Sequence, residues 1–436
     1  MNALYTVIPI NLEGISGLDG MVLGCFGKNG GGERHVKGHS RYPTSHKVIE
    51  HYERSFSRYE LSAKEGDALA QYQLGFMYCH GYGVRQSYAK ALLWLKKSAE
   101  RGFIKAQHIL GYLHNHNPEL MHIPRDYKKA YYYLKLAALQ GYAPAQRDLG
   151  FLCYTNIEIS GDYSKSVHWL EKAALKNDTR AQYHLGFMYY KGDTLPQDIE
   201  TSIYWFQKAA QRKHLGAQYK LGLIFDEGYG VAKDCKKAVY WYRRAITNGS
   251  TKAMNNLAFM YLNNCATPVA YKKAIKLYAI AAKKKDTMAE YNLGVMCHNG
   301  YGVHLDYKTA RFWYKRAANK EDPSAQRNLG LMYYNGNGGK KDYRRAFQYF
   351  LQATIKGDAV ATLNLSSMYY NGCGTPRSYE KAIHLYEQVS RSFLLSEECR
   401  LGVMYGKCHN IIRETIDEGD VGYAGLLPLG KYDNIW

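Results

Sequence analysis

Hydrophobic residues recur along this chain with a fixed period. Leucine stands at ten places that lie 36 residues apart, with a single interval of 39, namely residues 74, 110, 149, 185, 221, 257, 293, 329, 365 and 401. The residue that follows is glycine in eight cases and the small Ala258 or Ser366 in the other two. Self-similarity at a fixed period of this length is the signature of a tandem array of structural repeats.

The first half of each period predicts an amphipathic helix. We number its positions from the small residue after the leucine, which we call the small position. Ala at −5, Leu at −1, the small residue itself and an aromatic residue often at +3 fall on one helical stripe, as in Ala181, Leu185, Gly186 and Tyr189. The small residue lets a neighbouring helix approach closely, although glycine costs roughly 1 kcal/mol within a helix.

The second half of each period predicts another helix after a glycine-rich turn such as "GYGV" at 228–231. Asp or Ser, which can cap a helix N-terminus, precedes it at Ser87, Asp126, Asp162, Asp198, Asp234, Asp306, Asp342 and Ser378. In the sixth repeat Ala270 takes the place of this capping residue. Along 236–245, "KKAVYWYRRA", the helical period places Ala238, Trp241 and Ala245 on one face.

The fold class that follows is all-α, a right-handed α-solenoid of about nine stacked helix-turn-helix repeats of 36 residues. We expect the repeats to occupy 68–410, with 46–67 forming an N-terminal capping helix. Residues 1–45 contain two glycine-rich stretches and show no helical period, which predicts a flexible segment. Residues 411–436 are expected to be a C-terminal cap or tail.

The repeat motif resembles a known family. The pattern A-x-x-x-L-G-x-x-Y-x-x-G-x-G-V, followed by D-x-x-K-A-x-x-W-Y-x-K-A-A, is similar to the Sel-one-like repeat, a relative of the tetratricopeptide repeat, and the best copy is residues 289–322. The resemblance implies an α-solenoid and a role in partner binding and scaffolding, because the motif specifies a fold rather than a reaction. Family members include bacterial host-interaction proteins, fungal regulators and adaptors of ubiquitin ligases at the endoplasmic reticulum.

If the helix pairs stack as in tetratricopeptide arrays, the first helices line a concave groove, and the residues at position −3 face it. These candidate partner-binding residues are Tyr72, His108, Arg147, Tyr183, Tyr219, Asn255, Tyr291 and Arg327. Tyrosine and arginine offer large contact areas with polar ends, which suits binding. The alternative is that these side chains pack against the adjacent first helix. Irregular turns at 114–125, 155–161 and 263–270 could supply variable contacts at one edge.

Composition narrows the class of protein. No run of about 18 apolar residues predicts a membrane span, and the N-terminus does not resemble a signal peptide. Nine cysteines without paired spacing suit a reducing compartment, so we expect a cytoplasmic location. The sequence offers no catalytic constellation, cofactor motif or metal-ligand spacing, which predicts a protein that is not an enzyme.

We therefore expect a non-enzymatic scaffold or adaptor that holds a protein or peptide in its concave groove and at its edge loops. One alternative is an adaptor of a ubiquitin ligase at the endoplasmic reticulum, against which the missing signal counts. Another is RNA binding, because the formal net charge is +20. Against RNA binding, the groove positions are mixed aromatic and polar, and many Lys and Arg residues lie on the second helices, where a solvated outer face accounts for them.

Overall fold

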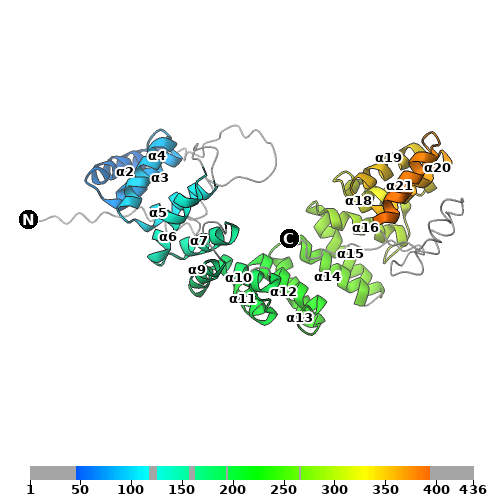
Figure 1. Ribbon diagram of the computed structural model, residues 1–436, viewed down its shortest axis with the longest axis horizontal. Coiled ribbons are helices and arrows are strands. Elements are labelled where there is room, and N and C mark those ends of the chain that lie inside the picture. Colours follow the sequence, from blue (N-terminus) through cyan, green and yellow to red (C-terminus); the bar gives the residue numbers. More distant parts are fainter. Residues whose placement is uncertain (1–45, 117–124, 157–162, 193–194, 265–266, 393–436) are drawn as a thin grey trace, which may run out of the picture. The chain divides into compact units, whose positions relative to one another are not determined.

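The computed structural model describes residues 46–116, 125–156, 163–192, 195–264 and 267–392, which form nineteen α-helices and no strand (Figure 1). The chain divides into two compact units, Met1–His214 and Leu215–Trp436, which we call unit 1 and unit 2. The predicted all-α solenoid of paired helices is confirmed. The structure does not describe residues 1–45 or 393–436, so the segments predicted at both ends, and the last part of the array, lie outside it.

Unit 1 contains one leading helix and four helix pairs. Its helices are α2 (His46–Lys64), α3 (Ala68–His80), α4 (Tyr88–Glu100), α5 (Ile104–His116), α6 (Tyr127–Leu139), α7 (Ala143–Thr155), α9 (Ser164–Leu175), α10 (Thr179–Lys191) and α11 (Ile199–Gln211). Helix α2 lies in the segment predicted to cap the array. It contacts α3, and the ring of Phe56 meets the ring of Tyr78 edge-on at 5.5 Å.

Unit 2 contains five helix pairs. Its helices are α12 (Leu215–Glu227), α13 (Cys235–Thr247), α14 (Thr251–Asn264), α15 (Pro268–Lys283), α16 (Thr287–Asn299), α17 (Tyr307–Ala318), α18 (Pro323–Asn335), α19 (Tyr343–Ile355), α20 (Ala359–Asn371) and α21 (Tyr379–Ser392). In both units the two helices of a repeat pack together, and the second helix packs on the first helix of the next repeat.

Seven of the nine second helices that the structure describes begin directly after the capping residue that the sequence indicates, the exceptions being α9, where Tyr163 makes no side-chain cap bond, and α15. Asp126, Asp198, Asp234, Asp306 and Asp342 each accept a hydrogen bond from a backbone N–H of the first turn. This satisfies donors that the helix itself leaves unpaired. Ser87 and Ser378 accept equivalent bonds of 3.4 Å, whereas Asp162 lies outside the described residues.

In the sixth repeat the second helix is capped by a residue other than the one at the usual position. Ala270 occupies the place of the usual aspartate, but α15 begins earlier, at Pro268. Thr267 precedes it, and its hydroxyl accepts a hydrogen bond of 3.2 Å from the N–H of Ala270. Proline suits the first helical position because it lacks an N–H that would need a partner there. The start of the helix therefore shifts by three residues from the position that the period predicts.

Close packing explains the small position. A Cβ atom added at Gly222 would lie 2.5 Å from a ring carbon of Tyr242, and one added at Gly186 would lie 2.7 Å from a ring carbon of Phe206. Both aromatic rings are fully buried. The first and second helices of a repeat can touch only because the side chain is absent. Trp241, predicted to face inward, is 8% exposed.

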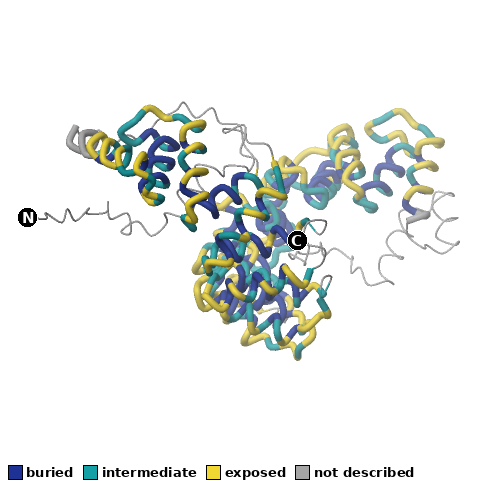
Figure 2. Tube along the Cα trace, turned by 60° about the vertical axis from the view of Figure 1, so that its left-hand side comes forward, coloured by how far each residue is buried: buried dark blue, intermediate teal, exposed yellow. Residues whose placement is uncertain are grey.

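Buried residues form a series of clusters along the chain, because each helix pair packs on its neighbours. Figure 2 shows the buried stretches of each helix alternating with exposed ones along the tube. One cluster of unit 1 runs from Tyr78 to Leu113, and one of unit 2 runs from Tyr291 to Met368. Such an array gains stability from nearest-neighbour interfaces. The side chains that remain exposed on each helix are therefore available for other contacts.

Candidate functional site

The eight predicted groove residues all occupy the first helices, but they differ in exposure. His108, Asn255 and Tyr291 are buried, with 4%, 0% and 3% of their surface exposed. The five that are partly exposed are Tyr72, Arg147, Tyr183, Tyr219 and Arg327. Position −3 therefore lies at the edge of the buried interface between successive repeats.

One group of these residues donates a hydrogen bond to the aspartate that caps the next first helix. Arg147 bonds Asp178 at 3.0 Å, Asn255 bonds Asp286 at 2.9 Å, and Arg327 bonds Asp358 at 2.7 Å. Each pair is 31 residues apart, so the contact repeats with the array. The aspartate also accepts a backbone N–H of its own helix, as Asp178 does from Ala181. Position −3 thus ties one repeat to the cap of the next.

A second group bonds position −2 of the next first helix. The ring Nε2 of His108 lies 2.8 Å from an Asp148 carboxylate oxygen. In unit 2, Asn256 donates to the Tyr219 hydroxyl at 3.3 Å. Asn328 donates to the Tyr291 hydroxyl at 3.4 Å. These bonds hold successive first helices side by side, which agrees with the contacts of α5 with α7 and of α12 with α14.

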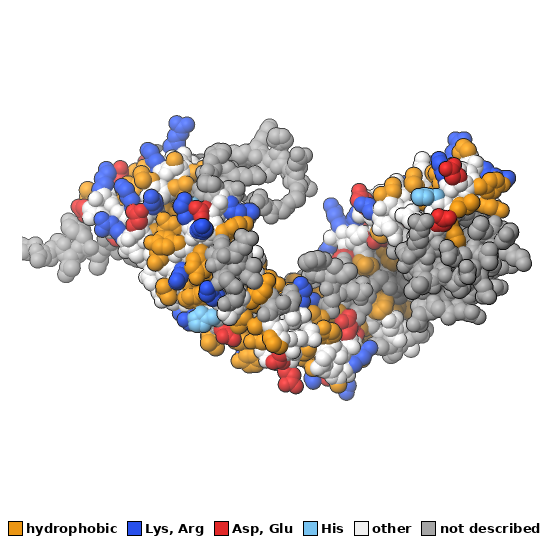
Figure 3. Space-filling view, in the orientation of Figure 1, with side chains coloured by type: hydrophobic (Ala, Val, Ile, Leu, Met, Phe, Trp, Pro, Cys, Tyr) orange, Lys and Arg blue, Asp and Glu red, His pale blue; other side chains and the backbone are white. Residues whose placement is uncertain are grey.

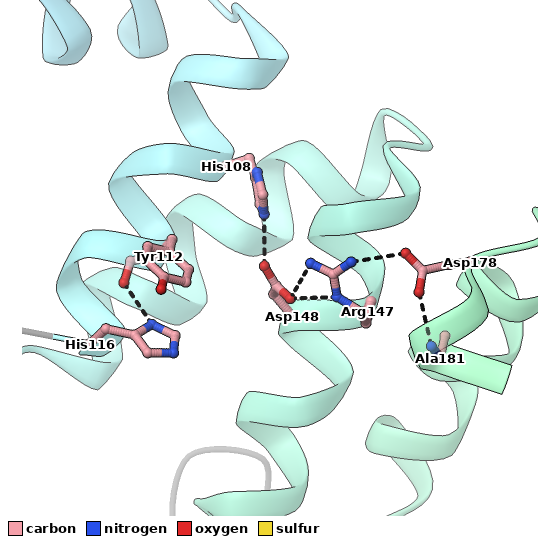
Figure 4. Close-up of polar contacts among 7 residues, drawn as sticks. All are labelled: His108, Tyr112, His116, Arg147, Asp148, Asp178 and Ala181. Atoms are coloured by element: carbon pink, nitrogen blue, oxygen red, sulfur yellow. Dashed lines mark hydrogen bonds and ion pairs between the residues drawn. The ribbon is translucent and has the colours of Figure 1, made fainter. Parts of the chain in front are cut away.

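The two kinds of contact meet in unit 1 at Asp148 (Figure 4). Its carboxylate is bonded by His108 from α5, and the guanidinium of the adjacent Arg147 reaches the same carboxylate at 2.8 Å. Arg147 continues to Asp178 at the start of α10, so the network spans three repeats. Burial raises the pKa of Asp148, but the bonds from His108 and Arg147 outweigh this effect, and the pKa lies well below its usual value. The carboxylate therefore stays ionised and fixes the network.

Tyr72 and Tyr183 contact aromatic residues in the turns that connect one repeat to the next. The ring centroids of Tyr183 and His214 lie 4.5 Å apart, and the ring centroids of Tyr72 and Phe103 lie 5.0 Å apart. Burial and the charge of Arg147 lower the pKa of the adjacent His184 to about 4. His184 is consequently neutral at pH 7, so this part of the face combines aromatic rings with uncharged imidazole.

Position +1 of the first helices carries an aromatic stripe that the sequence argument missed. In unit 1 it is Phe76, Tyr112, Phe151 and Phe187, one per repeat, which we call the unit 1 stripe. Phe151 is 38% exposed and the other three are partly exposed. Figure 3 shows hydrophobic side chains gathered among basic ones on the visible face of this unit.

Imidazole rings accompany three members of the stripe. His80 lies 4.1 Å from Phe76, His116 stacks on Tyr112 at 4.0 Å, and His184 lies 5.0 Å from Phe151 (ring centroids). The contact between Phe151 and His184 joins α7 to α10, so the stripe crosses successive first helices. The sequence contains the signal for this stripe, because the residue at position +1 is aromatic in four consecutive repeats.

Unit 2 does not continue this stripe. Its +1 residues are Leu223, Phe259, Val295, Leu331 and Ser367, and Leu223 and Val295 are fully buried. The same place in the repeat therefore presents aromatic rings in unit 1 and mainly aliphatic or small side chains in unit 2. A partner that needs aromatic contacts would find them in unit 1.

The described parts of the chain contain no group of three or more His, Cys, Asp and Glu residues arranged to hold a metal ion. None of the described helices is long and apolar enough to cross a membrane.

Comparison with solved structures places the fold among known repeat proteins. The protective antigen c5321 of uropathogenic Escherichia coli, described as having an SLR fold, is 27% identical with a TM-score of 0.64, covering 88% of this chain and 85% of that one. A Sel1 repeat protein from Oxalobacter formigenes is 28% identical with a TM-score of 0.49, covering 56% of this chain and 96% of the other. No curated protein matches the chain.

The family model described as the Sel1 repeat matches nine consecutive segments, which together run without long gaps through most of the chain. They are 68–103, 104–142, 143–178, 179–214, 216–250, 251–286, 287–322, 323–358 and 359–390. Sel1 repeats generally form a non-enzymatic scaffold for protein–protein interaction. The period, the paired helices and these matches agree, and the chain belongs to the Sel1 repeat family.

Proposed function

We propose that this protein is a scaffold that binds an extended peptide or protein segment along the first-helix face of unit 1. The observation that carries the proposal is the unit 1 stripe, in which each of four successive repeats presents a partly exposed aromatic residue. Aromatic side chains dominate binding hot spots because they bury a large area and lose little conformational entropy. A row of them at a regular spacing suits a partner that lies across several repeats.

Bonds between the helices that carry the stripe support the proposal, because they fix these helices relative to one another. His108, Asp148 and Arg147 link α5 to α7, and Arg147 continues to the cap of α10. A surface that is ordered before binding loses less entropy when the partner arrives. We propose that the partly exposed Arg147 and Tyr183 also touch the partner, whereas the buried His108 serves the network.

The predicted groove residues of unit 2 offer fewer exposed side chains to a partner. Tyr219 and Arg327 are partly exposed and can extend the contact, while Asn255 and Tyr291 are buried between repeats. Of the three irregular turns proposed as edge contacts, 114–125 and 155–161 lie mainly outside the described residues, whereas 263–270 is described except for residues 265–266. The test therefore concentrates on unit 1.

Peptides selected from a random display library on the intact protein would supply a measurable ligand. We expect Phe151→Ala and Tyr112→Ala each to weaken peptide binding, measured by fluorescence anisotropy, by roughly thirtyfold, the effect of losing about 2 kcal/mol at a hot spot. Phe259→Ala is the matched control, because Phe259 is partly exposed at the same repeat position in unit 2. Circular dichroism checks that each variant is folded. Equal losses for Phe151→Ala and Phe259→Ala, or none for the two unit 1 variants, would refute the proposal.

A further inference from the structure

The second helices of unit 2 have an unusual charge pattern. Four of its five second helices, α13, α15, α17 and α19, contain no Asp or Glu, whereas the last, α21, contains Glu380 and Glu387. Helices α13, α15 and α17 each contain four Lys or Arg residues, and α19 contains two. In unit 1, by contrast, three of the four second helices contain an acid, namely Glu100, Glu171 and Glu200. We call the exposed side of α13, α15, α17 and α19 the basic face.

Many charges on the basic face are not neutralised locally. Lys236, Lys272, Lys276 and Lys315 are exposed, and within the described parts of the chain none of them has a carboxylate within 4.0 Å. The nearby acids are engaged elsewhere. The buried carboxylate of Glu290 binds Arg316 and Lys320, both at 2.7 Å. Like charges gathered on one face create a positive potential that attracts polyanions.

Exposed aromatic rings stand among these charges. Tyr240 of α13 and Phe312 of α17 occupy the same repeat position and are 51% and 54% exposed. Each ring meets the following tryptophan edge-on, with centroids 5.0 and 5.1 Å apart. Arg244 and Arg316 lie 5.6 and 5.8 Å from the two exposed rings. Each ring is thus held by its neighbours, while about half of the surface of the residue remains exposed.

A hollow of about 560 Å³ opens between α17, α18 and α19. The repeat frame explains it, because α19 carries Gln348 and Gln352 where α17 carries Phe312 and Arg316. Lys315, Arg345 and Lys356 line the hollow together with these two amides. Its one carboxylate, Glu321, is paired with Lys356 at 2.7 Å. Cationic and amide donors therefore outnumber acids in a space large enough for a small polar group.

Two arginine side chains lie close to Tyr333, which lines this hollow, and they affect the pKa of its hydroxyl. Arg345 lies within hydrogen-bond distance of it at 3.4 Å, and the guanidinium carbon of Arg311 lies 3.7 Å from the ring centroid. Burial raises the pKa of Tyr333, but the bonds from Arg345 and Arg311 outweigh burial and lower the pKa below its usual value. An environment that stabilises a phenolate also stabilises a phosphate.

We propose that the basic face of unit 2 binds single-stranded nucleic acid. Lys and Arg side chains of α13, α15, α17 and α19 contact phosphates, bases stack on Tyr240 and Phe312, and the hollow beside α19 holds a phosphate against Lys315 and Arg345. Exposed rings interleaved with cations are the arrangement by which single strands are bound with little sequence preference. A membrane-binding surface would group its apolar side chains for insertion, whereas here Lys276 separates the two rings in the repeat frame.

The first experiment measures the affinity of the full chain for a fluorescein-labelled 20-nucleotide oligouridylate by anisotropy. If about five phosphates are contacted, the affinity should fall roughly a hundredfold between 50 and 200 mM salt. The triple substitution Lys272→Gln, Lys276→Gln and Lys315→Gln should weaken binding at least tenfold at low salt. The matched control changes Lys96, Lys128 and Lys135, exposed on α4 and α6 of unit 1, to Gln and removes the same charge. Equal losses for the two triples would mean that net charge alone attracts the strand, and would overturn the proposal.

The second experiment tests stacking. Tyr240→Ala with Phe312→Ala should weaken oligouridylate binding by roughly tenfold or more. Tyr204→Ala is the control, because Tyr204 of α11 has the same repeat position, is 49% exposed and has Lys208 over its ring at 5.3 Å. An unchanged affinity for the double variant would refute stacking. Binding to vesicles containing 30% phosphatidylserine but not to oligouridylate would assign the face to membranes instead, and binding to neither would exclude both.

Discussion

Units 1 and 2 are built from the same repeat but differ in which face carries conspicuous side chains. Unit 1 presents the aromatic stripe of Phe76, Tyr112, Phe151 and Phe187 on its first helices, while three of its four second helices contain an acid. Unit 2 has mainly aliphatic or small residues in the stripe position and acid-free second helices from α13 to α19. The contrast shows that the buried positions of the repeat are shared by the two units, whereas the residues on their exposed faces differ.

The largest expected effect concerns the frame that both units share. Phe206 of unit 1 and Tyr242 of unit 2 pack against the glycine of their own repeat and are fully buried. Phe206→Ala and Tyr242→Ala should each lower the free energy of unfolding by about 3–5 kcal/mol, because each leaves a cavity. Urea unfolding followed by tyrosine and tryptophan fluorescence measures the loss. A loss in one unit only would show that the two frames are not equivalent.

The next effect separates the two units by their inter-repeat bonds. Arg147 holds both Asp148 and Asp178, whereas Arg327 holds Asp358 as its one carboxylate among the described residues. Removing the guanidinium takes away the ion-pair partner of Asp178 and one of the two partners of Asp148, which keeps His108, so Arg147→Ala should cost about 3 kcal/mol and Arg327→Ala less. Hydrogen exchange on the helices that flank each site measures the difference. If Arg147→Ala leaves stability intact yet abolishes peptide binding, its role lies in the partner contact rather than in the network.

Acid should affect unit 1 more than unit 2. The folded-state pKa of His184 is lowered to about 4, and those of His80 and His214 are also lowered by burial. These histidines contribute full stability above the unfolded value of about 6.5, and the contribution falls as pH drops from 6.5 toward 4, because the unfolded chain binds protons first. For His184 the loss should approach roughly 2–3 kcal/mol.

Urea unfolding at pH 7 and at pH 4.5 tests this pH dependence, with hydrogen exchange to assign the change to a unit. In unit 2, burial lowers the pKa of His298. His184→Gln should remove most of the pH-dependent part in unit 1, and His298→Gln is the matched control. A greater acid loss in unit 2 would reverse the comparison.

The smallest expected effect lies on the outer faces. Tyr204→Ser and Tyr240→Ser remove rings that are 49% and 51% exposed at the same repeat position. Because each ring is about half exposed and contacts the following tryptophan edge-on at 5.0 Å, both variants should lose only about 1 kcal/mol of stability, and by similar amounts. Thermal melting measures both. A clearly larger loss at Tyr240 than at Tyr204 would mean that its ring serves the fold of unit 2 rather than an outside ligand.

Much of the fold could be predicted because its determinants are local. The period, the small position opposite a buried ring and the aspartate caps at Asp198 or Asp306 depend on residues close in sequence. The start of α15 could not be placed by the period, because Thr267 and Pro268 offered a better helix start than the usual position. The candidate site depends on contacts between repeats, so the groove residues stay a prediction. Position −3 was chosen by analogy with stacked helix pairs, and the structure buries His108, Asn255 and Tyr291 there.

The sequence by itself determined the helix pairs, because hydrogen bonds within a helix and its caps join residues only three or four positions apart. It also determined the close contact of the two helices in a repeat, since the small residue and the large residue packed on it, such as Gly222 and Tyr242, belong to the same repeat. The tertiary structure decided which side chains remain exposed. That outcome depends on contacts between repeats, such as Arg147 with Asp178 and Tyr291 with Asn328, which lie 31 and 37 residues apart. Only the stacking of whole helix pairs brings such residues together.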